Sequence, residues 1–282
     1  MCKRQGAGVN RSDFYPVAMT IAGSDSGGGA GIQADLRTFA ALGVYGCSAI
    51  TALTAQNPFG VSGIQPADPE NLQMQIQAVL AEFDVRAIKT GMLFSDGLIR
   101  VVAECLKGWN GMLIVDPVMI STSGVPLLKE EAVETLMAEL LPRAAVVTPN
   151  RMEAERIAGM SIRSLQEMER AARICQEKFG CGGVVVKGGH AEQEEESVDL
   201  CLFDGEVTLL RSPRLLLPEC ATHGTGCTFS AALAAAVASG MDRVSAAKTA
   251  KKFVFESLRH AVRPGRRVSA MFPPFFQKGL PE

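Results

Sequence analysis

The feature that most constrains the fold is the alternation of short apolar runs with segments of helical periodicity. Each run ends at or near a glycine, proline or asparagine, and the six clearest runs span residues 17–22, 45–53, 87–93, 112–119, 144–150 and 183–189. Apolar strands that alternate with helices are typical of βα units, whose strands form a mostly parallel sheet. The sequence therefore predicts an α/β fold.

Three further segments refine this prediction. Residues 32–43 place apolar side chains on one helical face, and residues 228–240 form an alanine-rich helical run. Both segments end in a glycine, as helices commonly do. Residues 197–210 break the alternation, because Asp204 and Gly205 separate two alternating runs and so predict a hairpin at an edge of the sheet.

The composition favours one domain with a small-molecule partner. The 282 residues are 47% hydrophobic and 21% charged, enough to bury a sizeable core, and no proline- or serine-rich linker divides them. We expect an N-terminal extension over residues 1–15, a single domain over 16–262 and a C-terminal tail over 263–282. The net charge of −2 provides no general attraction to nucleic acid or to an anionic membrane.

The cysteines and the hydropathy pattern predict a cytoplasmic protein. None of the eight cysteines forms a CxxC pair, and several lie inside apolar stretches, as expected for reduced thiols rather than for a zinc site. Residues 1–16 lack the continuous apolar core of a signal peptide, and no run approaches the roughly 18 apolar residues that a membrane span needs. We therefore expect no membrane partner.

A glycine-rich stretch follows the first apolar run. GSDSGGGAG, residues 23–31, holds five glycines but matches neither the GxxxxGK[ST] nor the GxGxxG spacing, which disfavours a Rossmann dehydrogenase. Ligands of parallel sheets bind at the carboxyl ends of the strands, where this loop is expected. Two interpretations stay open: the loop lets the backbone approach a ligand beside Asp35, or it is a flexible connection and Asp35 stabilises the helix dipole.

The stretch HGTGC, residues 223–227, comes directly before the alanine-rich helix. Gly224 and Gly226 flank Thr225 at the helix start, where backbone N–H groups and the helix dipole favour an anion. The same field is expected to lower the pKa of Cys227, which then serves as a general base toward a substrate hydroxyl. A base is favoured over a nucleophile because no partner His and Asn or Asp is evident. A buried structural cysteine is the alternative.

Acidic and basic side chains follow other predicted strands. Asp116 and Glu153 provide the one or two carboxylates that Mg²⁺ usually takes beside phosphate oxygens and water, so they predict a magnesium site for phosphoryl transfer. Asn150 and Glu153 also have capping-box spacing, which is equally consistent with a structural role. Lys187 either meets a phosphate or is a surface charge.

Seven motifs occur along the chain in one order: GSDSGGGAGIQADL, ITALTAQN, KTGML, DPVM, TPNRMEA, VKGGH and HGTGCTFSAAL. This order resembles the hydroxymethylpyrimidine/phosphomethylpyrimidine kinases of thiamine biosynthesis, which belong to the ribokinase-like superfamily, and the resemblance covers residues 16–262. It implies a three-layer α/β/α fold. It also implies ATP- and Mg²⁺-dependent phosphorylation of the hydroxymethyl group of 4-amino-5-hydroxymethyl-2-methylpyrimidine, then of the monophosphate, by a homodimer.

The resemblance assigns roles to individual residues. The pyrimidine-binding positions are Asp35, Gln56, Met92 and Val118; the catalytic position is Cys227, where ribokinase relatives carry an aspartate; the anion hole is Gly224, Thr225 and Gly226; the nucleotide or magnesium-phosphate positions are Asn150, Glu153 and Lys187. A carboxylate and an amide can pair with the ring nitrogens and amino group of an aminopyrimidine, between apolar walls. Taken alone, Gln56 is a turn amide, and Met92 and Val118 are core residues.

Two other functions stay open. A pyridoxal or pyridoxine kinase of the same type acts on a similar hydroxymethyl group, although TAQN and KGGH favour the pyrimidine. A non-catalytic pyrimidine-binding sensor would need Asp35 and Gln56 but not the anion hole.

The C-terminal tail departs from the resemblance. Many members of the family end in a Gly-His-Gly-Pro-like segment, whereas this chain reads RPGRRVSAMFPPFFQKGLPE. Its arginines, Arg263, Arg266 and Arg267, either border the nucleotide site or lie in a solvated terminus. We expect the solvated terminus.

Overall fold

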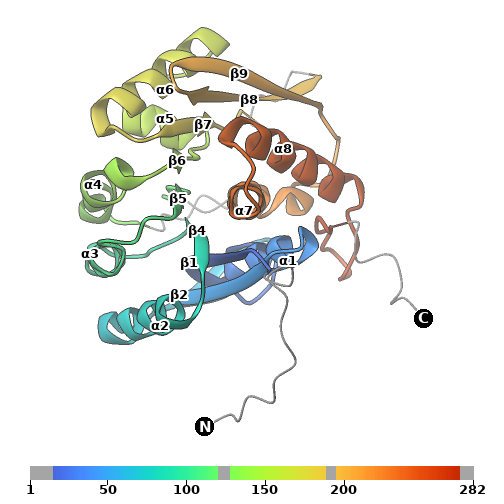
Figure 1. Ribbon diagram of the computed structural model, residues 1–282. Helices are drawn as coiled ribbons and strands as arrows, with labels where there is room; N and C mark the ends of the chain where they lie inside the picture. The colour runs from blue at the N-terminus through green and yellow to red at the C-terminus, as the bar shows by residue number, and fades with distance from the viewer. Residues whose placement is uncertain (1–14, 120–127, 189–194, 274–282) are drawn as a thin grey trace.

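The computed structural model describes residues 15–119, 128–188 and 195–273 (Figure 1). The strands are β1 (Val17–Asp25), β2 (Tyr45–Asn57), β3 (Gly60–Pro66), β4 (Val85–Thr90), β5 (Met112–Val115), β6 (Val146–Val147), β7 (Gly183–Val186), β8 (Glu196–Phe203) and β9 (Glu206–Pro213). Within the described ranges these nine strands form one sheet in the order β3-β2-β1-β4-β5-β6-β7-β8-β9. The six strands from β2 to β7 in that order pair in parallel, and the outer pairings of β3, β8 and β9 are antiparallel. The predicted mostly parallel α/β fold is confirmed.

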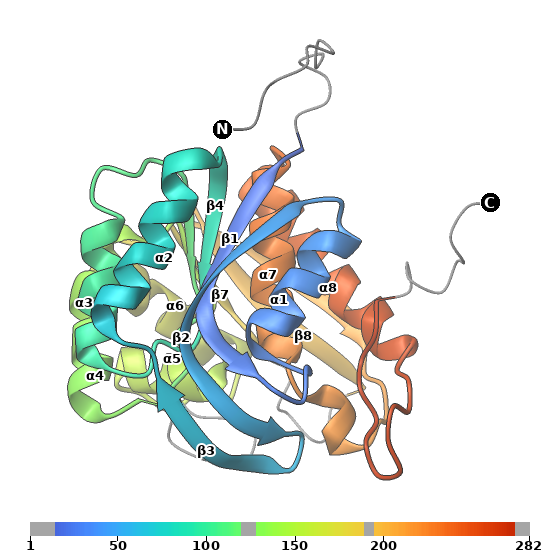
Figure 2. The ribbon, with the colours of Figure 1, turned by 90° about the horizontal axis from the view of Figure 1, so that it is seen from below.

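Helices cover both faces of the sheet. They are α1 (Gly31–Ala41), α2 (Pro69–Glu82), α3 (Asp96–Cys105), α4 (Glu130–Glu139), α5 (Arg151–Ala158), α6 (Leu165–Phe179), α7 (Thr225–Ala238) and α8 (Arg243–Arg259), with short 3₁₀ helices η2 (Leu141–Arg143) and η3 (Glu219–Thr222). Helices α1, α7 and α8 lie on one face and α2 to α6 on the other (Figures 1 and 2), each packed on its own apolar core. This confirms the three-layer architecture. No helix in the described ranges is long and apolar enough to cross a membrane.

Helix α7 brings the HGTGC stretch into the centre of the molecule. Every residue of α7 from Thr228 to Ala238 is buried, and most of them are alanine. Alanine has the highest helix propensity and a short side chain, so α7 can lie close to the sheet while α1 and α8 pack on its sides. The helix begins after Gly224, whose φ is +81° and whose added Cβ would lie 1.9 Å from the carbonyl oxygen of Gly29. The start of α7 is therefore fixed against the glycine loop.

The two hairpins differ in how well the sequence predicts them. The β8–β9 hairpin turns at Asp204 and Gly205, as expected, and both residues have positive φ. The β2–β3 hairpin is missing from the prediction, which ends the second strand at Leu53, although β2 continues to Asn57 and pairs with β3. The turn between them reads NPFG, a combination of turn-forming residues that signals this second hairpin.

The described part of the tail is exposed over residues 263–267, as expected for its arginines, and packs against the domain over residues 268–273. Val262 and Ala270 form an antiparallel bridge, and the backbone N–H of Phe272 donates to Ser257 in α8. Met271 is only 6% exposed. Burial of these apolar side chains holds the segment against the domain.

The tail arginines lie in the exposed stretch before this packed segment. The Arg267 guanidinium lies over the ring of Phe59 in the β2–β3 turn, at 5.0 Å from its centroid, and Arg263 donates to the carbonyl oxygen of Arg266. Arg267 therefore borders the β2–β3 hairpin. Residues 274–282 and 1–14, which include most of the predicted N-terminal extension, lie outside the described residues.

Candidate active site

The carboxyl ends of the parallel strands lie at the side of the sheet where α1 and α7 begin (Figure 2), and the polar residues predicted from the sequence lie at or just after these strand ends or at the helix starts. Backbone hydrogen bonds continue across this edge beyond the strands themselves. Gly23 N–H donates to Met92, Asp116 N–H to Thr90, and Lys187 N–H to Pro149. The loops after β1, β4, β5, β6 and β7 are thus held in register beside one another.

The glycine loop closes around its own carboxylate. Asp25 Oδ1 accepts the N–H of Gly27 at 2.8 Å, and Oδ2 accepts those of Gly29 at 3.1 Å and Ala30 at 2.8 Å. Burial alone would raise the pKa of Asp25, but hydrogen bonds from His223, Ala30 and Gly27 bring it below its usual value. The N–H groups that a glycine-rich loop can turn toward a phosphate are here satisfied by an internal anion.

A buried ion pair lies beneath this loop. Lys89 in β4 places Nζ 2.8 Å from Asp35 Oδ2 in α1, and both side chains are fully buried. Thr20 donates to the same Asp35 oxygen at 2.6 Å. Burial alone would lower the pKa of Lys89, but the charges of Asp35, Cys227 and Asp116 raise it, so the lysine stays charged. The predicted pyrimidine ligand Asp35 is therefore bound to a lysine that the sequence left without a role.

Cys227 lies in the first turn of α7, as predicted, but its pKa is raised rather than lowered. Burial is the largest cause, and the carboxylates of Asp35 and Asp116 add to it. The charge of Lys89 and a hydrogen bond from the backbone of Gly31 act in the opposite direction. The expected lowering fails because the helix start lies in a desolvated site, where burial is the largest influence on the pKa of the thiol.

The expected phosphate-binding residues form a second group. Lys187 Nζ lies 2.8 Å from Asp116 Oδ1, and its side chain is 13% exposed, so it is not a surface charge. A Cβ added to Gly226 would lie 3.2 Å from the same Nζ, which places the lysine against the first turn of α7. Lys187, Asp116 and the glycine-rich start of α7 therefore form one continuous polar region.

Asn150 and Glu153 make the capping box of α5 that their spacing allows. Asn150 Oδ1 accepts from Glu153 N at 2.9 Å, and Glu153 Oε2 accepts from Asn150 N at 2.8 Å. Burial, together with the charge of Asp116, raises the pKa of Glu153 to about 7 against the influence of Lys187. The capping role is thus confirmed, and it holds the carboxyl group close to Asp116.

The carboxylates suit a divalent cation that arrives with phosphate. Among the described residues no group of three or more candidate metal ligands is found. Magnesium, however, needs only one or two carboxylates when phosphate oxygens and water complete its shell. The charge of Asp116 adds to the effect of burial in raising the pKa of Glu153, and a cation bound beside the two carboxylates would relieve this repulsion.

The other three residues that are predicted to bind the pyrimidine lie at the ends of three different strands or shortly after them. Gln56 lies near the end of β2, half-buried, with its backbone oxygen accepting from Ser26 at 3.0 Å. Met92 follows β4 and contacts Gly23, since a Cβ on that glycine would lie 2.5 Å from Met92 Cε. Val118 follows β5 and is partly buried. Gln56 and Met92 therefore both border the glycine loop.

Sequence reasoning missed three buried polar residues of this region, Asp25, Lys89 and His223. A signal existed for Lys89, because a lysine inside the apolar run AIKTGML needs a buried partner. The contact between Asp25 and His223 joins positions 198 apart in the sequence, so no local pattern reveals this pair.

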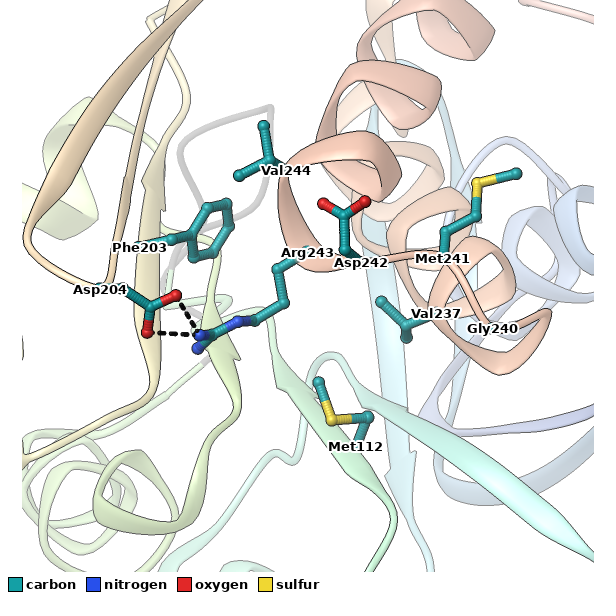
Figure 3. Close-up of a pocket in the computed structure, with 9 residues that line it drawn as sticks. All are labelled: Met112, Phe203, Asp204, Val237, Gly240, Met241, Asp242, Arg243 and Val244. Carbon is teal, nitrogen blue, oxygen red and sulfur yellow. Dashed lines mark hydrogen bonds and ion pairs between the residues drawn. The ribbon is translucent and has the colours of Figure 1, made fainter.

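A separate cavity of about 350 Å³ lies at the amino-terminal end of β5, where α7 connects to α8 (Figure 3). Arg243 in its wall donates to both carboxylate oxygens of Asp204, at 2.7 and 2.8 Å, and to the carbonyl oxygen of Gly182. The same guanidinium lies 5.4 Å from the ring centroid of Phe203. These contacts tie α8 to the β8–β9 hairpin, so this cavity has a structural explanation.

A family model described as phosphomethylpyrimidine kinase matches residues 25–271. The chain belongs to the phosphomethylpyrimidine kinase family. The hydroxymethylpyrimidine/phosphomethylpyrimidine kinase of Haemophilus influenzae is 46% identical over 254 residues, which are 88% of this chain and 93% of the relative. The likeness to the phosphomethylpyrimidine kinase family therefore continues into the tail, beyond the predicted boundary at residue 262.

Solved structures show the same ribokinase-like fold. The phosphomethylpyrimidine kinase of Clostridium difficile 630 has a TM-score of 0.76 at 40% identity and covers 86% of this chain and 99% of its own. The pyridoxal kinase of Staphylococcus aureus, in complex with AMP-PCP and pyridoxal, has a TM-score of 0.84 at 32% identity and covers 94% and 96%. The fold of the phosphomethylpyrimidine kinase family is thus shared with kinases that have another substrate.

Proposed function

We propose that this chain transfers the γ-phosphoryl group of ATP to the hydroxymethyl oxygen of 4-amino-5-hydroxymethyl-2-methylpyrimidine, and then to the resulting monophosphate, in thiamine biosynthesis. The observation that carries the proposal is the surroundings of Cys227 at the start of α7. Its thiol accepts a backbone hydrogen bond from Gly31 in α1 and is influenced by the charges of Lys89 and of Asp116, which is paired with Lys187. A helix start, two lysines and two carboxylates at one strand edge provide the positioning and charge stabilisation that phosphoryl transfer requires.

In the first step, the pyrimidine oxygen forms a bond to the γ-phosphorus while the bond from that phosphorus to the leaving ADP oxygen breaks. The hydroxymethyl proton goes to the thiolate of Cys227. The N–H groups of Gly224, Thr225 and Gly226 face the transferring phosphoryl oxygens, and Lys187 neutralises their charge. Because burial raises the pKa of Cys227, a higher pH than for an ordinary thiol is needed to convert it to the thiolate that acts as the base.

The pyrimidine ring binds beside the glycine loop. The amide of Gln56 pairs with the ring nitrogen and amino group, and Met92 and Val118 form apolar walls. Asp35 is fully buried, with both carboxylate oxygens accepting from Lys89, so its proposed contact with the ring requires a shift of the side chain toward the site.

ATP brings Mg²⁺, which neutralises charge on the phosphates. Asp116 and Glu153 are proposed as its protein ligands, and Asn150 and Lys187 as contacts of the nucleotide phosphates. We also propose that the enzyme is a homodimer, as the resemblance implies. A cytoplasmic location agrees with the seven free cysteines of the described residues.

A pyridoxal kinase is the second candidate, favoured by the likeness to the Staphylococcus aureus enzyme. A coupled ADP-release assay with hydroxymethylpyrimidine, its monophosphate and pyridoxal decides between them. We expect kcat/KM to be highest for the two pyrimidines. Faster turnover of pyridoxal would assign the chain to the second candidate, and binding of the pyrimidine without ADP release from any substrate would indicate a sensor.

A further inference from the structure

His223 has no part in the mechanism above, yet it is buried in the centre of the candidate site. We infer that His223 is a positioning residue that sets the orientation of the Gln56 side-chain amide, and thereby selects an aminopyrimidine over a pyridine substrate. The inference rests on the proposed function, since it concerns the specificity of the same site.

The ring of His223 links three segments of the chain. Its Nε2 lies 3.0 Å from Asp25 Oδ2, although the two residues are 198 positions apart, and 3.4 Å from the side-chain nitrogen Nε2 of Gln56. The histidine is 8% exposed and Asp25 is 2% exposed. A Cβ on Gly29 would lie 2.5 Å from His223 Cδ2, so the glycine provides the space for the ring.

The hydrogen on the ring can be assigned from its neighbours. Asp25 Oδ2 also accepts the N–H groups of Gly29 and Ala30, as a carboxylate does, and a carboxylate oxygen cannot donate. The hydrogen between Asp25 and His223 is therefore on Nε2. The second ring nitrogen, Nδ1, is buried without a partner among the described residues, so the hydrogen bonds of the ring are made by Nε2.

This assignment fixes the amide of Gln56. In the structure Gln56 Nε2 faces His223 Nε2, but a nitrogen that carries a hydrogen cannot accept one from the amide NH₂. A half-turn of the amide exchanges its nitrogen and oxygen, and the oxygen is the group that can share the Nε2 hydrogen with Asp25. The other neighbour agrees: Thr54 Oγ1 lies 2.8 Å from the carbonyl oxygen of Ser24 and 3.0 Å from Gln56 Oε1, but its single hydrogen can go to only one of these two acceptors. The Ser24 carbonyl cannot donate and therefore takes that hydrogen, whereas the amide can turn its NH₂ toward Thr54. Thr54 must therefore accept from the amide NH₂. Both contacts select one of the two amide orientations.

The fixed amide matches one ligand chemistry. Its second N–H donor and the second lone pair of its oxygen lie side by side, as do the ring nitrogen and the amino group of a 4-aminopyrimidine. A pyridine substrate lacks an amino group next to its ring nitrogen. A site built to hydrogen-bond such a pair discriminates against the analogue without it, because buried groups stay unpaired. Without His223 the amide can rotate, and this discrimination weakens.

Two substitutions at His223 test the inference. His223→Phe keeps a planar ring and removes the N–H donor, whereas His223→Gln offers a side-chain N–H at a similar reach. We expect His223→Phe to raise KM for hydroxymethylpyrimidine about tenfold, the size of one hydrogen bond, while kcat and KM for ATP change less than about twofold. The ratio of kcat/KM for pyridoxal to that for the pyrimidine should rise. His223→Gln should restore most of the wild-type KM for hydroxymethylpyrimidine and most of the wild-type preference for the pyrimidine over pyridoxal.

A double-mutant cycle separates positioning from packing. In a Gln56→Ala background, His223→Phe should raise KM for the pyrimidine no further, because the amide through which it acts is gone. A full further increase in that background, or a parallel rise in KM for ATP, would overturn the inference. If His223→Phe fails to fold, His223→Asn replaces it, since its shorter amide does not reach Asp25 as Nε2 does.

Calorimetric titration of the pyrimidine without ATP compares the pyrimidine affinity of the wild type with that of His223→Phe, independently of turnover. If the wild-type enzyme binds the pyrimidine but releases no ADP, the proposed function fails while the role of His223 is still measured. Equal pyrimidine affinity for the wild type and His223→Phe would refute the role of His223 whatever the activity.

Discussion

Replacing Lys89 with methionine measures how strongly the buried ion pair supports the site. The side chains of Lys89 and Asp35 are both fully buried and lie 2.8 Å apart. Methionine fills part of the space of the lysine stem but leaves the carboxylate without its cation. Removing one partner of such a pair costs about 3–5 kcal/mol of the free energy of unfolding. At about 2–4 °C per kcal/mol for a chain of this size, Tm should fall by about 6–20 °C.

The loss should depend on pH. Burial raises the pKa of Asp35, and Lys89 is the strongest influence opposing it. Without Lys89 the pKa of Asp35 is therefore raised further. A carboxyl group with a raised pKa in the folded state contributes stability that is complete below its unfolded pKa of about 3.9 and is lost as the pH rises through the folded pKa. Urea unfolding should thus show a smaller loss at about pH 5 than at about pH 8.

The matched control removes both charges. In Lys89→Met combined with Asp35→Asn, no charge is left buried, so most of the lost stability should return. An equal loss of Tm at both pH values, with no recovery in the double variant, would show that Lys89 acts through packing and not through its charge.

Further predictions concern three other residues of the site. Cys227→Ala should leave pyrimidine binding intact and lower kcat about a hundredfold, the usual scale for a general base; unchanged turnover would remove the thiol from the mechanism. Wild-type kcat should rise with pH, because burial raises the pKa of Cys227. Since the pKa of Glu153 is raised from 4.5 to about 7, its contribution to stability is complete below pH 4.5 and lost as the pH rises through about 7. Glu153→Gln should therefore flatten the pH dependence of the urea midpoint, and an unaltered slope would contradict the raised pKa. Gly224→Ala should reduce both Tm and turnover, because the new Cβ would lie 1.9 Å from the Gly29 carbonyl oxygen; wild-type values for both would contradict that close approach.

Features set by neighbouring residues could be predicted from the sequence. The Asp204-Gly205 turn and the capping box of Asn150 and Glu153 depend on residues within one turn of each other, and both are present. The order of strands and helices follows from the periodicity of the apolar residues. The candidate site residues could be placed at one sheet edge because parallel strands end together.

Features set by distant residues could not be predicted in this way. Burial raises the pKa of Cys227, and the carboxylates of Asp35 and Asp116, which come from α1 and the loop after β5, add to this effect. A local argument includes the helix start but not this burial, so it predicts a shift in the wrong direction. The partner of Lys89 is likewise 54 residues away. Such pairings depend on packing, which only the three-dimensional structure shows.

The contact between the glycine loop and the start of α7 has a consequence for the order of folding. Asp25 and His223 are separated by 198 positions, and α1 packs directly on α7. During synthesis, the loop around Asp25 leaves the ribosome long before the histidine that completes its hydrogen bonds. The binding site is therefore assembled only when the last quarter of the chain has been made, and contacts of such long sequence separation form slowly. A nascent chain that stops before α7 lacks the HGTGC stretch and two of the three helices, α7 and α8, that cover one face of its sheet.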